Sequence, residues 1–109
     1  MENPFIPVGG EALDGQMASA VALLFTSPDC GVCHALRPRL ESMLGAFPQM
    51  MPVMVDVAQE PELAREWQVS ALPTLVLLFE GRETVRFCRS FGVAPVREAI
   101  ERPYALLFD

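Results

Sequence analysis

The hydrophobic positions of this chain change their period along the sequence, and each period predicts a kind of element. Runs of mostly apolar residues at 21–26, 53–57 and 74–79 predict three buried strands of a sheet. Residues 84–89 alternate apolar with polar side chains, which predicts a half-exposed antiparallel strand after a turn at 80–82.

The segments between these runs show the three- and four-residue spacing of amphipathic helices. The predicted helices are 31–47, 61–67, one that begins at Pro95 and, more weakly, 11–19. Pro38 lies inside the first of these and is expected to kink it, while Pro103 is expected to stop or bend the last. Residues 1–10 are expected to form an extended lead-in with at most one short strand, at 5–8.

The order of these elements predicts a fold class. Strand, helix, strand, helix, strand, strand and helix together predict an α/β sandwich with parallel central strands and an antiparallel edge hairpin. The chain has 109 residues, of which 51% are hydrophobic and 20% charged, and this suits one domain with a buried core. Residues 1–109 show no repeat or linker, so a single domain is expected.

Charge and hydropathy argue against two classes of partner. Eight basic and 14 acidic residues give a net charge of −6, and no basic cluster is available for nucleic-acid phosphates. No apolar run approaches the roughly 20 residues of a membrane-spanning helix. Neither a nucleic acid nor a membrane is therefore expected as a partner. With no export signal visible and only three cysteines, a cytoplasmic location is expected.

The candidate chemistry lies in Cys30-Gly31-Val32-Cys33, where a predicted buried strand ends and a helix begins. A helix N-terminus has unpaired N–H groups and a partial positive charge, and both stabilise a thiolate. Such a position lowers the pKa of a cysteine thiol. Cys30 is therefore the candidate nucleophile. Cys33, one turn later on the same face, can resolve a mixed disulfide, and Gly31 lets a partner backbone approach closely.

Three other interpretations of these cysteines are open. They could pack in the core, because cysteine behaves as a small hydrophobic residue. Cys30 to His34 also spells the C-x-x-C-H pattern of c-type haem attachment, although the strand-rich pattern argues against it. Zinc could be held by Cys30, Cys33, His34 and Cys88, although a second C-x-x-C half-site is missing. No metal or other cofactor is expected, because a dithiol itself carries two electrons.

The chain resembles the thioredoxin family, most strongly over residues 21–100. The matching features are the strand–CxxC–helix unit, Pro38 five residues after the second cysteine, Ala71-Leu72-Pro73-Thr74, and Gly92 after the last strand. The resemblance implies a thioredoxin-like three-layer α/β/α sandwich with a mixed central sheet. It also implies a cis peptide bond before Pro73.

The resemblance further implies a thiol–disulfide oxidoreductase that acts on protein disulfides. Cys30 would attack, Cys33 would resolve, and the backbone of Leu72 would pair with a substrate strand beside Pro73. The other expected substrate-binding positions are Gly31, Val32 and Gly92. The implied partners are protein disulfide substrates and a reductase or dithiol electron donor.

Several positions depart from the family pattern. Asp29 stands where members usually have Trp, and Val32 stands where they have Pro. The buried acid that assists proton transfer falls on Leu24, and its Lys partner falls on Pro52. The chain therefore lacks the usual acid–base pair. This favours the alternative function, a thioredoxin-fold binding or maturation factor with weak or no redox turnover.

For several further residues, the sequence predicts mainly structural positions. His34 is expected on the outer, solvated face of its helix, with a cation that tunes the dithiol as the alternative. Cys88 is expected on the opposite face of its strand from Phe87. Core positions are expected for Trp67, Met50, Met51 and Met54. The apolar tail 104–108 is expected to fold back on the domain or to cover a partner chain.

Overall fold

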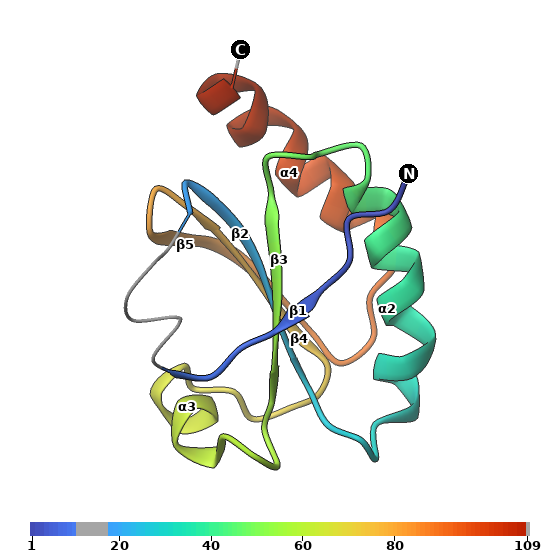
Figure 1. Cartoon of the computed structure of the whole chain (residues 1–109), viewed down its shortest axis with the longest axis vertical. Helices are drawn as coiled ribbons and strands as arrows, with labels where there is room; N and C mark the ends of the chain where they lie inside the picture. Colours follow the sequence, from blue (N-terminus) through green and yellow to red (C-terminus); the bar gives the residue numbers. More distant parts are fainter. Residues whose placement is uncertain (11–17, 109) are drawn as a thin grey trace.

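The computed structural model of the chain describes residues 1–10 and 18–108. A five-stranded sheet runs through it in the order β1-β3-β2-β4-β5 (Figure 1). The elements in chain order are β1 (Ile6–Pro7), β2 (Ala20–Thr26), α2 (Gly31–Leu44), β3 (Met51–Asp56), α3 (Pro61–Glu66), β4 (Thr74–Phe79), β5 (Arg82–Cys88) and α4 (Val93–Phe108). Most of the helix expected at 11–19 lies outside the described residues.

The sheet is mixed, as expected. β1, β3 and β2 run parallel, β4 runs antiparallel to β2, and β5 runs antiparallel to β4. Because β4 runs against β2, its first residue, Thr74, pairs with Phe25 near the end of β2. Cys88 at the end of β5 pairs with the same Thr74. The ends of β2, β3 and β5 and the start of β4 therefore meet at one end of the sheet.

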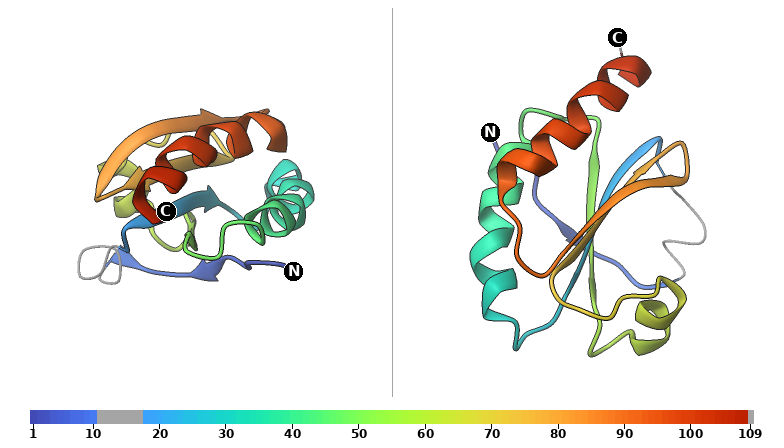
Figure 2. Two further views of the ribbon diagram at one scale, coloured as in Figure 1. Left: turned by 90° about the horizontal axis from the view of Figure 1, so that it is seen from above. Right: turned by 180° about the vertical axis from the view of Figure 1, so that it is seen from behind.

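Alternate residues of the central strands pack on opposite faces of the sheet. The even-numbered apolar residues of β2 pack with α2 and α4, and the odd-numbered ones pack with α3. Figure 2 shows α2 and α4 together on one side of the strands, away from α3. β2 is buried on both faces, which explains its continuous apolar run.

α4 corrects one expectation about a proline. The helix continues through Pro103 to Phe108, so of the two expected effects of this proline, a stop or a bend, the stop is wrong. Proline removes the N–H that would bond to the carbonyl of Ala99 in the preceding turn. The side chains beyond Pro103 pack on the rest of the domain, and these tertiary contacts offset the missing backbone bond.

The C-terminal turns of α4 pack back onto the domain, one of the two outcomes expected for the tail. The rings of Tyr104 and Phe47 meet edge to face, with 5.0 Å between their centres. The backbone N–H of Gln49 donates to the Tyr104 hydroxyl at 2.9 Å. Leu107 and Phe108 are half-buried against the same core. The last residues of α4 therefore cover one end of the core that α2 and α4 share.

A buried carboxylate ties the N-terminal segment to α2. The side chain of Glu41 accepts the backbone N–H of Phe5 at 2.8 Å and the Arg37 side chain at 3.2 Å. The backbone N–H of Asn3 donates to the carbonyl of Glu41 at 3.0 Å. A buried charge is tolerated when such partners satisfy it. Glu41 therefore joins the lead-in of β1 to the helix that follows the cysteines.

The expected core positions hold for three of four residues. Met50 is buried, and Met54 and Trp67 are half-buried against the two core clusters. Met51 is 37% exposed, so its expected core position is wrong. It begins β3 on the face that α3 covers, but α3 lies beyond the other end of that strand (Figure 1).

β5 is joined to the turn after α3 by an arginine. Arg86 donates to the two carboxylate oxygens of Glu83 at 2.6 and 2.8 Å. This hydrogen bonding is the largest cause of the lowered pKa of Glu83. The same guanidinium donates to the carbonyl of Trp67 at 3.0 Å. Arg86 thus links β5, the outer strand of the hairpin, to the turn after α3.

Candidate active site

Cys30 is the N-cap residue of α2, and its sulfur accepts the backbone N–H of Cys33 at 3.2 Å. Its backbone is extended, as is usual for a residue that caps a helix. The N–H of Cys30 in turn donates to the carbonyl of Ser27 at 3.2 Å, in the turn that follows β2. The positive end of the helix dipole and the Cys33 N–H, which has no partner within the helix, therefore both point to the Cys30 sulfur.

Cys30 and Cys33 are joined by a disulfide, with 5.3 Å between their Cα atoms. Cys30 is half-buried, whereas Cys33 is only 2% exposed. Between them, Val32 is 56% exposed, and open space lies over the position where Gly31 lacks a side chain. The site therefore presents Cys30 and the two following residues at the surface and keeps Cys33 inside.

The peptide bond between Leu72 and Pro73 is cis, as the resemblance implies. Pro73 is buried directly before β4, and its carbonyl accepts the N–H of Arg89 at 2.8 Å. Within the part of the chain that the structure describes, the backbone N–H and carbonyl of Leu72 have no hydrogen-bond partner. A free donor and a free acceptor therefore stand at the same end of the sheet as the cysteines.

Cys88 and Gly92 lie at this end of the sheet as well. Cys88 is an exposed free cysteine whose sulfur lies 3.7 Å from the Thr74 hydroxyl, and Gly92 is exposed just before α4. Phe87 packs towards α2 and α4. Every site residue expected from the sequence is at this end of the sheet: Cys30, Gly31, Val32, Cys33, Leu72, Pro73 and Gly92.

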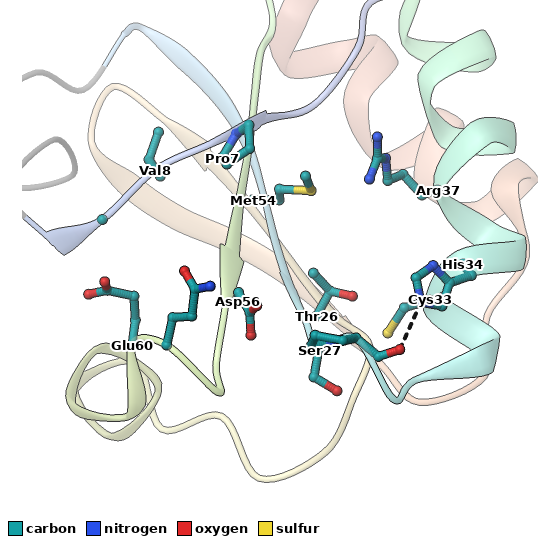
Figure 3. Close-up of a pocket in the computed structure, with 13 residues that line it drawn as sticks. Pro7, Val8, Thr26, Ser27, Cys33, His34, Arg37, Met54, Asp56 and Glu60 are labelled. Atoms are coloured by element: carbon teal, nitrogen blue, oxygen red, sulfur yellow. Dashed lines mark hydrogen bonds between the residues drawn. The ribbon is translucent and has the colours of Figure 1, made fainter.

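A cavity of about 430 Å³ lies behind Cys33, between α2, the N-terminal segment and the ends of β2 and β3 (Figure 3). Its polar lining consists of Thr26, Ser27, His34, Arg37, Asp56, Gln59 and Glu60. His34 is exposed, as expected, and one ring nitrogen lies 3.0 Å from the carbonyl of Pro28. The sequence pattern assigned no role to Asp56, whose place beside Thr26 depends on the pairing of β2 with β3.

The two positions to which the resemblance assigns the usual acid–base pair are apolar and buried, and the strand register pairs Leu24 with Met54 rather than with Pro52. Leu24 is fully buried in β2, and Pro52 is buried in β3. In residues 1–10 and 18–108, no three His, Cys, Asp or Glu side chains gather as metal ligands. The zinc set considered above is thus not assembled. In those same ranges, no helix has the length and apolar character needed to cross a membrane.

The sequence comparisons find thioredoxins among the relatives of this chain. The family model described as Thioredoxin matches residues 11–100. A thioredoxin from Chlamydia trachomatis is 34% identical over 80 residues, which cover 72% of this chain and 78% of that protein. Thioredoxin H2-2 from Oryza sativa is 35% identical over 66 residues, which cover 61% of this chain. The aligned part spans only about half, 49%, of the rice protein.

Solved structures of thioredoxins have the same fold. A thioredoxin mutant from Halobacterium salinarum superposes with a TM-score of 0.81 at 25% identity, covering 92% of this chain and 90% of that one. Chloroplastic thioredoxin z also gives a TM-score of 0.81, at 22% identity, covering 96% of this chain and 98% of that one. The second likeness shows the fold alone.

Proposed function

The chain belongs to the thioredoxin family of thiol–disulfide oxidoreductases, and from this premise we propose that it reduces protein disulfides with Cys30 as nucleophile. The observation that carries the proposal is the hydrogen bond from the Cys33 N–H to the Cys30 sulfur at the start of α2. A donor aimed at the sulfur stabilises the thiolate, which is the attacking form.

The proposed reaction has two displacements. The Cys30 thiolate attacks one sulfur of the substrate disulfide, a bond forms between them, and the other substrate sulfur leaves as a thiolate. Cys33 then attacks the Cys30 sulfur, and the second substrate sulfur leaves. Two electrons pass to the substrate, and the Cys30–Cys33 disulfide remains. We propose that a reductase or dithiol donor then reduces this disulfide.

The substrate would be held as an added strand. The unpaired backbone of Leu72 offers one hydrogen-bond donor and one acceptor. An extended peptide pairs with the edge of a sheet through such backbone groups. The other proposed contact positions are Gly31, Val32, Pro73 and Gly92, which lie at the same end of the sheet. Peptides would therefore bind through backbone contacts, with little dependence on their sequence.

A binding or maturation factor without redox turnover is not favoured, because both cysteines are present and paired. We propose further that residues 1–109 act as one domain, since one sheet joins all the described strands. A cytoplasmic location is proposed as well. The exposed free thiol of Cys88 supports it, because such thiols persist in reducing compartments.

The proposal is tested by reduction of insulin disulfides with dithiothreitol as the electron donor. The wild type should accelerate the reduction, and Cys30→Ser should abolish the acceleration. Cys33→Ser should instead accumulate a mixed disulfide on Cys30, which mass spectrometry detects. Cys88→Ser is the matched control and should retain wild-type turnover. Equal turnover by the wild type and Cys30→Ser would contradict the proposal.

A further inference from the structure

Asp56 of β3 lies on the face of the sheet below Cys33. It is one row of paired residues further along the strands than Leu24, the position to which the resemblance assigns the family's acid. Leu24 of β2 pairs with Met54 of β3, and Thr26 pairs with Asp56 in the same register. Leu24 and Met54 pack on the α2 side of the sheet. Since side chains alternate along a strand, Thr26 and Asp56 lie on that side too, about 7 Å further along.

Asp56 and Cys33 line the same cavity from opposite walls. Figure 3 shows the Cys33 sulfur directed from α2 into the cavity, with Thr26 between it and Asp56 in that view. One carboxylate oxygen of Asp56 accepts the N–H of Ala58 at 2.9 Å, which orients the side chain. The other oxygen has no hydrogen-bond partner among the residues that the structure describes. It is available to water in the cavity.

The cavity is large and polar enough to hold a short chain of water molecules. Its volume is about 430 Å³, and several polar side chains line it. A water needs roughly 30 Å³ and two to four polar partners. Such a chain can carry a proton between Asp56 and the buried sulfur of Cys33.

The other charged or titratable groups around the cavity are Glu60, which precedes α3, and His34 and Arg37 from α2. The residues from the N-terminal segment are uncharged (Pro7, Val8 and Gly9). Arg37 is paired with Glu41, outside the lining of the cavity. Glu60 lies on the far side of Asp56 from Cys33 (Figure 3). Asp56 is therefore the carboxylate placed for exchange with Cys33.

We propose that Asp56 accepts the proton of the Cys33 thiol through water in this cavity. The proposal rests on the proposed function, because it concerns the second displacement. As Cys33 attacks the Cys30 sulfur, its proton passes through water to Asp56, a bond forms between the two protein sulfurs, and the bond to the substrate breaks. Asp56 later returns the proton through the same cavity to solvent.

The test separates the two displacements in a Cys88→Ser background. Reduced protein is mixed with one equivalent of dithiobis(nitrobenzoate), whose thiolate absorbs visible light when released. The first release reports attack by Cys30, and the second reports resolution by Cys33. Asp56→Asn keeps an acceptor for the Ala58 N–H, so its first release should be unchanged. Its second release at pH 7 should be slower by about tenfold or more.

The pH profile and two further variants distinguish proton transfer from a structural effect. Above about pH 9, where the Cys33 thiol ionises without a base, the second release of Asp56→Asn should be as fast as that of the wild type. Asp56→Ser, a second variant with an acceptor for the turn, should show the same deficit. Glu60→Gln is the matched control and should behave as the wild type. An unchanged second release at pH 7, a deficit that persists at high pH, or an equal deficit in Glu60→Gln would overturn the proposal. Absence of both releases in the wild type would overturn the proposed function and this role with it.

Discussion

At the scale of single residues, the two cysteines differ in what surrounds them. Cys30 caps a helix and receives a hydrogen bond from the Cys33 N–H, while Cys33 is almost completely buried. Asp29, next to Cys30 in the sequence, is exposed, and its negative charge opposes the thiolate. An exposed charge is screened by water, so the effect of the helix end should dominate.

We expect Cys30 to be the first thiol to react with iodoacetamide in the reduced protein at neutral pH. Of the three cysteines, only Cys30 combines partial exposure with a helix N-terminus, and the thiolate is the reactive form. Peptide mapping after short labelling should show at least about tenfold more label on Cys30 than on Cys33. Cys88, exposed on a strand, serves as an internal control and should label later. Earlier labelling of Cys33 or Cys88 would contradict the assignment.

At the scale of elements, α4 shows how tertiary contacts decide where a helix ends. The proline at 103 costs the helix a backbone hydrogen bond, yet the helix continues for five more described residues, to Phe108. Tyr104 contributes an aromatic contact and a hydrogen bond there, whereas Leu106 is 77% exposed. The two faces of the tail therefore differ sharply in their contribution to stability.

Tyr104→Ala should lower the free energy of unfolding by about 2 kcal/mol, because it removes the contact with Phe47 and leaves the Gln49 N–H to water. Leu106→Ala is the matched control and should change it by less than about 0.5 kcal/mol. Denaturation by urea measures both values. Equal values for the two variants would show that the tail does not pack on the core in solution.

At the scale of the whole molecule, a buried carboxylate connects the chain's beginning to its reactive helix. Glu41 satisfies the Phe5 N–H and the Arg37 side chain together, so one residue joins the N-terminal segment, α2 and the wall of the cavity. Burying a carboxylate is costly without such partners, and removing it leaves those partners without their acceptor.

Glu41→Ala should therefore lower the free energy of unfolding by about 2 kcal/mol. Glu41→Gln keeps an acceptor for the Phe5 N–H and should lower it by about half as much. Thermal unfolding of the oxidised protein measures the two changes. A smaller loss for the alanine variant than for the glutamine variant would show that this carboxylate does not hold the N-terminal segment.

The sequence by itself determined the elements and the reactive pair. Apolar runs and their period depend on local spacing, and so does the strand–CxxC–helix unit. Pro73 and its cis bond are expected from the resemblance to the thioredoxin family. These features place Cys30, Cys33 and Pro73 without knowledge of the packing. A local rule failed at Pro103, because propensity counts the lost backbone bond but not the contacts of Tyr104.

Only the tertiary structure decided which distant residues share the surroundings of Cys33. The cavity collects residues from the N-terminal segment, β2, α2, β3 and the approach to α3, and no spacing along the chain encodes that set. The pairing of Thr26 with Asp56 follows from the register of two parallel strands. Register is set by the packing of whole faces against helices, so the spacing of residues around the cysteines does not show that Asp56 lies beside Thr26.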